Sequence, residues 1–230
     1  MKRHDALFIA GVAVFFSPFF FSDAVLEGYK AFNLEHGIIM GAIKFGILAT
    51  LGEVIGLRIR TGNYNAPGFG ILPRAVVWAG LGMAIAYAFI VFPAGTIKFL
   101  SYMGLAVTPD TLKGAITGLQ FVTAFAISVG MNLIFATWMM TLHKITDEHI
   151  ARTGGTLAGF FRPIAFGDIL AKINWQVMWG FVFKKTIPLF WIPAHTITFL
   201  LPEQHRILFA AVLGVVLGVF LAIASLMGKK

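Results

Sequence analysis

The longest uncharged run in the chain has 29 residues, from Gly114 to Leu142. As a helix rising 1.5 Å per residue it would be about 43 Å long, more than the roughly 30 Å hydrocarbon core of a bilayer. The whole chain is 58% hydrophobic and only 12% charged, whereas soluble domains average about 25% charged residues. The sequence therefore predicts an all-α fold, a polytopic membrane helix bundle in contact with the lipid bilayer.

Six segments are candidate membrane helices: residues 6–22, 36–57, 75–92, 114–142, 186–201 and 207–228. The fifth is short and contains Pro188 and Pro193, each of which removes a backbone donor and frees a carbonyl. We therefore expect about six transmembrane helices, with five plus a re-entrant segment as the alternative. We also expect the Pro93-Ala94-Gly95 stretch to break the third helix, and residues 143–166 to form a polar loop.

Residues 1–28 are expected to add an N-terminal membrane helix and the start of an acidic loop. Small residues from Ser22 to Ala24 would also suit the cleavage site of a signal peptide. Pro18 and the late phenylalanines of the apolar run instead favour a helix that is retained. Residues 29–230 are expected to form a single membrane-embedded helical domain.

Lysine and arginine are distributed unequally between the two sides of a six-helix topology. One side holds 13, and the other holds four: Lys30, Lys98, Lys113 and Arg206. Because basic residues are enriched in cytoplasmic loops, we expect both termini on the cytoplasmic or matrix side of a bacterial or organelle inner membrane. The net charge of +8 is thus interpreted as orientation. We expect no nucleic-acid partner, since no basic patch alternates with aromatic residues in a soluble domain.

Two ionisable residues lie inside the second predicted helix, where charges are unfavourable and often functional. We expect Glu53 to form a structural ion pair with Arg74, the alternative being that it reaches headgroup water. Lys44 is expected to line a water-filled cavity, with snorkelling toward the acidic loop or a contact with a carbonyl as the alternative. A lysine in a pore would favour anionic solutes.

His36, at the start of the same helix, is a further candidate for a polar interior, together with four residues of other predicted spans: Gln120, His195, Thr196 and Thr198. Carbonyls freed by proline are tolerated in a membrane only where they are buried in protein or line a wet cavity. Residues 186–201 are therefore either a kinked helix packed against its neighbours or a broken segment lining a solute path. In both cases we expect this stretch to face the interior of the bundle.

The sequence offers little for catalysis or cofactor binding. It has no cysteine, and it lacks the Gly-x-Ser-x-Gly motif or paired membrane aspartates of intramembrane proteases. His143 and His149 lie beside Asp147 and Glu148, which we interpret as a solvated turn and not as a metal site. We expect no metal, no cofactor and no enzymatic activity. An intramembrane lipid-acting enzyme is the least favoured alternative.

Two glycine pairs have the spacing with which membrane helices approach closely, Gly114/Gly118 and Gly214/Gly218. Each pair could serve a homo-oligomer, a contact with another membrane protein, or packing within the monomer. A non-catalytic subunit or assembly factor of a larger membrane complex is therefore the main alternative to a pore.

Several positions match motifs of a known family. An opening motif, a Tyr-x6-His-Pro lead before a helix that ends in Gly-Asp, is matched at Tyr29, His36, Gly52 and Glu53. A closing motif of Trp-Pro, Asn-Phe and Val-Pro-x3-Arg is matched loosely at Trp191, Pro193, Thr198-Phe199, Leu201-Pro202 and Arg206. Gln120 takes the place of an Asp-Gln pair. Residues 29–225 thus resemble the small organelle membrane proteins typified by Mpv-seventeen and the 22-kDa peroxisomal membrane protein.

The chain departs from this family's pattern at several motif positions, among them Glu53 for Asp, Leu57 for Gln and Thr198 for Asn. Ile192 also splits the Trp-Pro pair. It therefore resembles a distant relative, bacterial or organellar. Members of the family are described as small pores or solute channels of inner mitochondrial and peroxisomal membranes. The resemblance implies a pore for small solutes, without naming the solute.

Overall fold

The structure is a computed structural model that describes residues 3–227, with side chains described as far as residue 223. Every regular element in this part of the chain is helical, which confirms the predicted all-α class. The helices are α1 (Arg3–Phe16), α2 (Pro18–Phe21), α3 (Asp23–Glu35), α4 (Gly37–Thr61), α5 (Ile71–Tyr102), the 3-10 helix η1 (Pro109–Leu112), α6 (Gly118–Met131), the π-helix η2 (Asn132–Ala136), α7 (Thr137–Arg152), α8 (Leu157–Phe160), α9 (Phe166–Lys172), α10 (Trp175–Val177), the π-helix η3 (Met178–Trp191), α11 (Ile192–Leu200) and α12 (Glu203–Met227).

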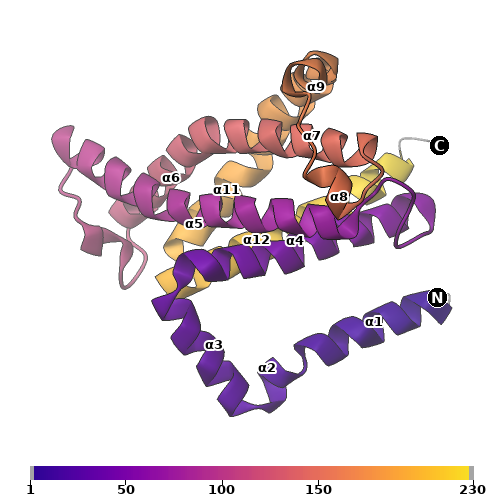
Figure 1. The fold of residues 1–230 in the computed structure, drawn as a ribbon. Coiled ribbons are helices and arrows are strands. Elements are labelled where there is room, and N and C mark those ends of the chain that lie inside the picture. Colours follow the sequence, from indigo (N-terminus) through magenta and orange to yellow (C-terminus); the bar gives the residue numbers. More distant parts are fainter. Residues whose placement is uncertain (1–2, 228–230) are drawn as a thin grey trace.

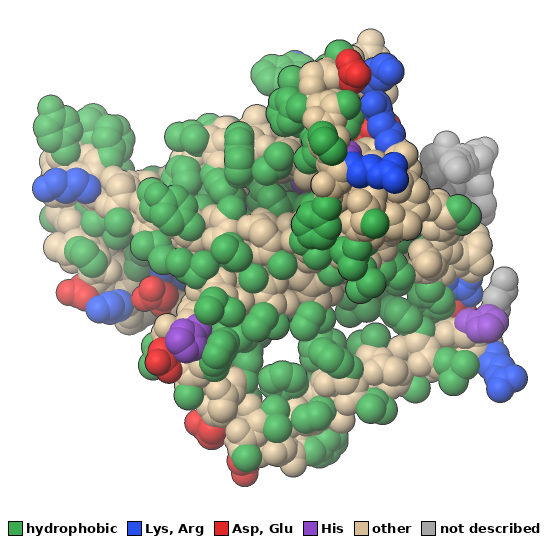
Figure 2. All heavy atoms as spheres, in the orientation of Figure 1, with side chains coloured by type: hydrophobic (Ala, Val, Ile, Leu, Met, Phe, Trp, Pro, Cys, Tyr) green, Lys and Arg blue, Asp and Glu red, His purple; other side chains and the backbone are tan. Residues whose placement is uncertain are grey.

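Among the described residues, four helices are long and apolar enough to cross a membrane: Gly37–Thr61, Ile71–Tyr102, Gly118–Arg152 and Glu203–Ile223. The third of these combines α6, η2 and α7. Hydrophobic side chains also cover much of the face shown in Figure 2. Together these features are typical of an integral, multi-pass membrane protein.

Length and composition identify four spans where the sequence predicted about six. α1 has 14 residues, about 21 Å of helix, which is shorter than a bilayer core. The predicted fifth span lies partly in η3 and partly in α11. Pro188 falls inside η3, and Pro193 is the second residue of α11, which continues η3 without a break.

Three predicted boundaries are wrong. α5 continues through Pro93, which is buried inside the helix and does not break it; neighbouring helices make such a proline tolerable in a membrane protein. α7 extends to Arg152, so the polar loop begins later than residue 143. The acidic stretch after residue 22 is helix α3, whose first turn is stabilised by Ser22, since its hydroxyl accepts from Val25 N at 3.4 Å.

Glycines let α4 pack closely against two neighbours (Figure 1). A Cβ on Gly41 would lie 2.7 Å from the carbonyl oxygen of Gly82 in α5, and one on Gly52 would lie 2.9 Å from Val215 Cα in α12. Gly218 also faces Gly52, so the Gly214/Gly218 helix packs within the monomer. The predicted Gly114/Gly118 helix face is wrong, because Gly114 lies outside α6 in a left-handed conformation.

The bundle has two ends, which we name after Arg74 and Glu203. α4 ends and α5 begins at the Arg74 end, where α7 also comes close because Asp147 contacts Arg74. α12 begins beside Gly37, the first residue of α4, because Glu203 and Gly37 line one surface pocket. Since Gly218 lies next to Gly52, α12 runs parallel to α4. The segment from α10 to α11 therefore connects the two ends of the bundle (Figure 1).

Helices α1 to α3 form an N-terminal arm that contains no buried residue. The start of α1 docks at the Arg74 end, where Asp5 accepts hydrogen bonds from Arg58 Nε at 2.8 Å and from the Tyr64 hydroxyl at 2.9 Å. Phe8 stacks on Tyr64 with 4.2 Å between ring centroids. The end of α3 joins α4 at the Glu203 end. Between these two contacts, the space-filling view shows an opening between the arm and the bundle (Figure 2).

Candidate functional site

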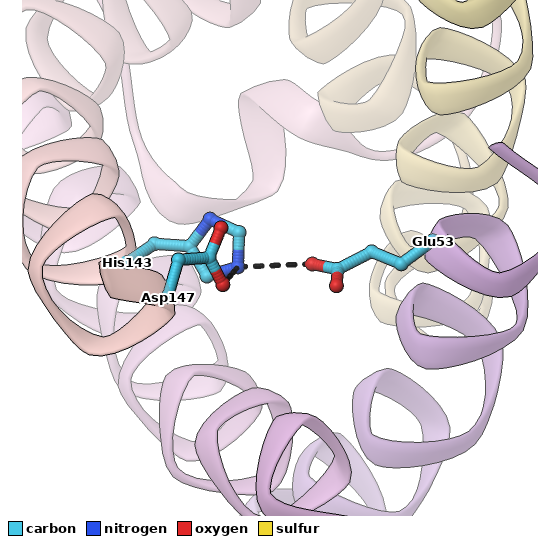
Figure 3. Close-up of side chains that lie close together, drawn as sticks. All are labelled: Glu53, His143 and Asp147. Atoms are coloured by element: carbon cyan, nitrogen blue, oxygen red, sulfur yellow. Dashed lines mark hydrogen bonds and ion pairs between the residues drawn. The ribbon is translucent and has the colours of Figure 1, made fainter. Parts of the chain in front are cut away.

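Five side chains from three helices form a polar cluster near the Arg74 end: Glu53 of α4, Arg74 and Trp78 of α5, and His143 and Asp147 of α7. The guanidinium of Arg74 bridges the two carboxylates, contacting Glu53 Oε2 and lying 2.6 Å from Asp147 Oδ1. Glu53 Oε1 accepts from Trp78 Nε1 at 2.8 Å and lies 3.0 Å from His143 Nε2 (Figure 3). The ion pair predicted from Glu53 and Arg74 is thus part of a larger network.

The charged groups of the cluster are paired with one another. Its two carboxylates face one guanidinium and one imidazole, and each charged side chain is at most 22% exposed. Since a carboxylate can only accept, His143 Nε2 carries the hydrogen that is directed at Glu53. A protonated His143 would make the cluster neutral, and buried charges are tolerated only when paired in this way.

Glu53, His143 and Asp147 could in principle hold a metal ion, because one ligand atom from each lies within 4.8 Å of the other two. Arg74, however, already supplies a cation to both carboxylates. The geometry therefore favours an ion-pair network. The solvated turn expected around these residues is wrong for His143 and Asp147, which face the bundle because α7 continues past them.

A cavity of about 230 Å³ lies between α4, α5, the α6–α7 helix, η3 with α11, and α12. Glu53, Trp78 and His143 line it on the side of the Arg74 end, and most of the remaining lining is apolar. Asn132, Trp191 and His195 contribute a second polar group to its wall. Asn132 begins η2 and Trp191 ends η3, so two residues of this group lie at the ends of π-helical segments, which often occur at functional sites.

The second polar group contains no Lys, Arg, Asp or Glu and is closely packed. The side-chain amide nitrogen and oxygen of Asn132 lie 3.0 Å and 3.1 Å from His195 Nδ1. The same amide nitrogen donates to Ser128 O at 2.8 Å. The imidazole of His195 stacks on the indole of Trp191, with 5.1 Å between centroids and 25° between planes. Ser128 in turn donates to Ile192 O at 2.7 Å, which ties α6 to the start of α11.

Lys44 does not line this cavity, contrary to the expected pore position. Its ammonium group contacts Asn33 Oδ1 of α3 and lies 5.3 Å from the centroid of the Tyr29 ring. Lys44 is buried, with 5% of its surface exposed, and its ammonium contacts a side-chain carbonyl oxygen of the arm, so it fits the structural contact with a carbonyl and not snorkelling to water, and it supplies no positive charge to the cavity. Nothing in the cavity wall supports the expected preference for anionic solutes.

The other predicted polar residues are used locally. Thr196 and Thr198 donate to carbonyls one turn earlier in their own helix, those of Ile192 and Ala194. Gln120 caps α6, where its side-chain oxygen accepts from the backbone N of Thr117 at 3.4 Å. His36 lies at the junction of α3 and α4, with its side chain 38% exposed. Glu53 and His195 are the predicted site residues that line the cavity.

Four cavity residues whose side chains carry a nitrogen atom were not predicted as site residues: Trp78, Asn132, His143 and Trp191. Their spacing held a usable signal, because Trp78 follows Arg74 by four residues and Asp147 follows His143 by four. Side chains four apart share one face of a helix. Extending the helix past Leu142 would have placed His143 and Asp147 on one face.

Fold and site together define an all-α integral membrane protein with a cavity between its helices and a buried ion-pair network at one side of it. Comparisons of the chain with protein-family models, with curated protein sequences and with solved structures found no match.

Proposed function

We propose that this protein is a small pore or channel-like protein that passes small solutes across an inner or organelle-type membrane. The observation that carries the proposal is the 230 Å³ cavity among the long apolar helices, with polar groups at two separate places in its wall. Asn132 and His143 are eleven residues apart on one continuous helix, which corresponds to roughly 16 Å along its axis. A solute could therefore exchange one polar partner for another along this path.

We further propose six crossings with both termini at the Arg74 end. In support, α1 starts beside Tyr64 at the Arg74 end, and α3 ends at the start of α4, at the Glu203 end. The arm therefore extends from one end of the bundle to the other, as a crossing would. The segment from α10 to α11 also connects the two ends. Arg58, Arg60 and Arg74 lie at the Arg74 end, which the positive-inside rule assigns to the cytoplasmic or matrix side. This arrangement fits a distant relative of the Mpv-seventeen family.

The experiment that tests this function is solute flux through purified protein in liposomes, with empty vesicles as the reference. Gly214→Phe should lower the flux severalfold, because Gly214 lines the cavity and a Cβ there would meet no atom within 4 Å. The matched control is Gly80→Phe, at an exposed glycine of α5 that also has open space around it. Flux no higher than in empty vesicles, or an equal effect of both variants, would contradict the proposal.

A further inference from the structure

Arg206 is a buried cation without a carboxylate partner. It lies near the start of α12, with 9% of its surface exposed. Its Nε donates to Leu201 O at 3.0 Å and its Nη2 to Phe199 O at 3.1 Å, so the guanidinium holds the end of α11. Within the described part of the chain, no acidic side chain forms an ion pair with it. Because a buried charge is unfavourable without an opposite charge, an anion is the partner that this site lacks.

One nitrogen of this guanidinium is open to such a partner. Nη1 makes no hydrogen bond within residues 3–223. It is not enclosed by protein either, because the fully buried side-chain atoms without a partner in those residues are Thr50 Oγ1 and Trp191 Nε1. Arg206 lines two surface pockets, of about 880 Å³ and 390 Å³. The two N–H groups of Nη1 are therefore donors available to a ligand.

The larger pocket adds further basic residues. The end of α5, the loop containing η1, the end of α11 and the start of α12 surround it, and the exposed Lys98 and Lys113 line it together with Arg206. Lys98 has no partner among the described residues, whereas Lys113 lies 2.6 Å from Asp110. Glu203 is the acidic residue in the lining. Three basic residues and one acidic residue give the pocket an excess of positive charge.

Much of the remaining wall is apolar, and it includes Pro93, Ile97, Leu112 and Leu200. The pocket lies where candidate membrane helices end and begin, which is the level of the lipid headgroups. Ile90 also lines the pocket and is 59% exposed, so the pocket continues onto the outer surface of α5. A free phosphate would leave the apolar wall in water, whereas the acyl chains of a lipid would cover it.

We propose that this pocket binds an anionic phospholipid. A phosphate oxygen accepts from Arg206 Nη1, and Lys98 and Lys113 attract the negative charge of the headgroup. The acyl chains lie over the apolar wall and continue into the bilayer beside Ile90. The inference goes beyond the proposed function, because a lipid site needs no conduction.

Native mass spectrometry of the full chain in detergent tests the site. The protein is mixed with equal amounts of phosphatidylglycerol and phosphatidylcholine that have the same acyl chains, and the bound fraction of each lipid is measured. Both lipids contain a phosphate, but the choline group cancels its charge. We expect phosphatidylglycerol to bind about tenfold more tightly, and equal binding of the two lipids would overturn the site.

Variants locate the preference. Lys98→Gln should lower it about fivefold, the usual contribution of one basic residue near an anionic membrane surface. Lys30→Gln is the matched control and should leave it unchanged, because Lys30 is exposed, pairs with Glu27 and lies outside the pocket. If Arg206→Gln fails to fold because α11 loses two hydrogen bonds, Lys98→Gln still decides. Equal effects of Lys98→Gln and Lys30→Gln would contradict the location.

Ammonium phosphate separates a lipid from a free anion. At the same concentration as the lipids it should not displace phosphatidylglycerol, since it has no chain for the apolar wall. Displacement would show that the pocket takes a free anion and would overturn the lipid proposal. The flux assay remains independent: preference for phosphatidylglycerol without flux supports this site and contradicts the pore, and flux without the preference does the reverse.

Discussion

Glu53 connects three helices, because its carboxylate contacts Arg74 and Trp78 of α5 and His143 of α7. Glu53→Gln keeps the shape of the side chain and removes its charge, which leaves Arg74 paired with Asp147 alone. We expect a loss of about 1–3 kcal/mol in the free energy of unfolding, seen as a lower thermal midpoint in detergent. Glu27→Gln, in the exposed pair with Lys30, should change stability by less than about 1 kcal/mol. Equal effects of the two variants would contradict a structural role for the cluster.

Lys44 gives a second prediction at the residue scale. Its ammonium group contacts Asn33 and not the cavity, so Lys44→Met should leave the ratio of anion to cation flux in liposomes unchanged. The same preparation must show the loss of flux in Gly214→Phe, which proves that the assay reports on the cavity. A changed ratio of anion to cation flux in Lys44→Met would show that this lysine does act on the solute path.

The contact between Glu53 and Arg74 was predictable because both residues lie near the basic ends of consecutive helices. The sequence could not indicate that His143 and Asp147 complete the cluster, since their partners are about 70 to 90 residues away. A polar stretch of sequence is easily predicted as a loop when the distant residues that pair with it are not known. The pocket around Arg206 is even less accessible to prediction, because it depends on where four helical segments meet.

At the scale of elements, long uncharged runs predicted the four long apolar helices but not their ends. α5 continues past Pro93, and α7 continues through several charged or titratable positions after Leu142, because packing and ion pairs satisfy groups that would otherwise need water. The π-helical geometry of η3 was also unpredicted. Two prolines indicated an irregular helix there, but not which kind of irregularity.

The crossing of α4 and α12 depends on Gly52. A Cβ at this position would lie 2.9 Å from Val215 Cα, so Gly52→Ala should push the helices apart and lower the free energy of unfolding by about 1–3 kcal/mol. Gly80→Ala is the matched variant, because Gly80 is exposed and a Cβ added there would meet no atom within 4 Å. Alanine favours a helix by about 1 kcal/mol over glycine, so Gly80→Ala should be neutral or stabilising. Thermal unfolding of both variants decides whether the close contact matters.

For the whole molecule, the six-crossing topology makes a direct prediction. The chain contains no cysteine, so single cysteines at exposed positions can be labelled by a reagent that does not cross the membrane. Cysteines replacing His4, Asn63 and Arg162 should react from one side, and those replacing Lys113 and Glu203 from the other. Labelling of His4→Cys together with Lys113→Cys would show that the arm does not cross. Labelling of Glu203→Cys together with Arg162→Cys would exclude the crossing from α10 to α11.

The parallel contact between α4 and α12 also bears on how the protein is made. Residues 52 and 215 are in contact although most of the chain separates them in sequence. Translation therefore produces the first long before the second. The Gly52 face of α4 thus lacks this protein neighbour until the last helix has been synthesised. A chain that stops before residue 203 would keep α4 and α5 paired through Gly41 and Gly82, yet its cavity would lack the wall that α12 supplies.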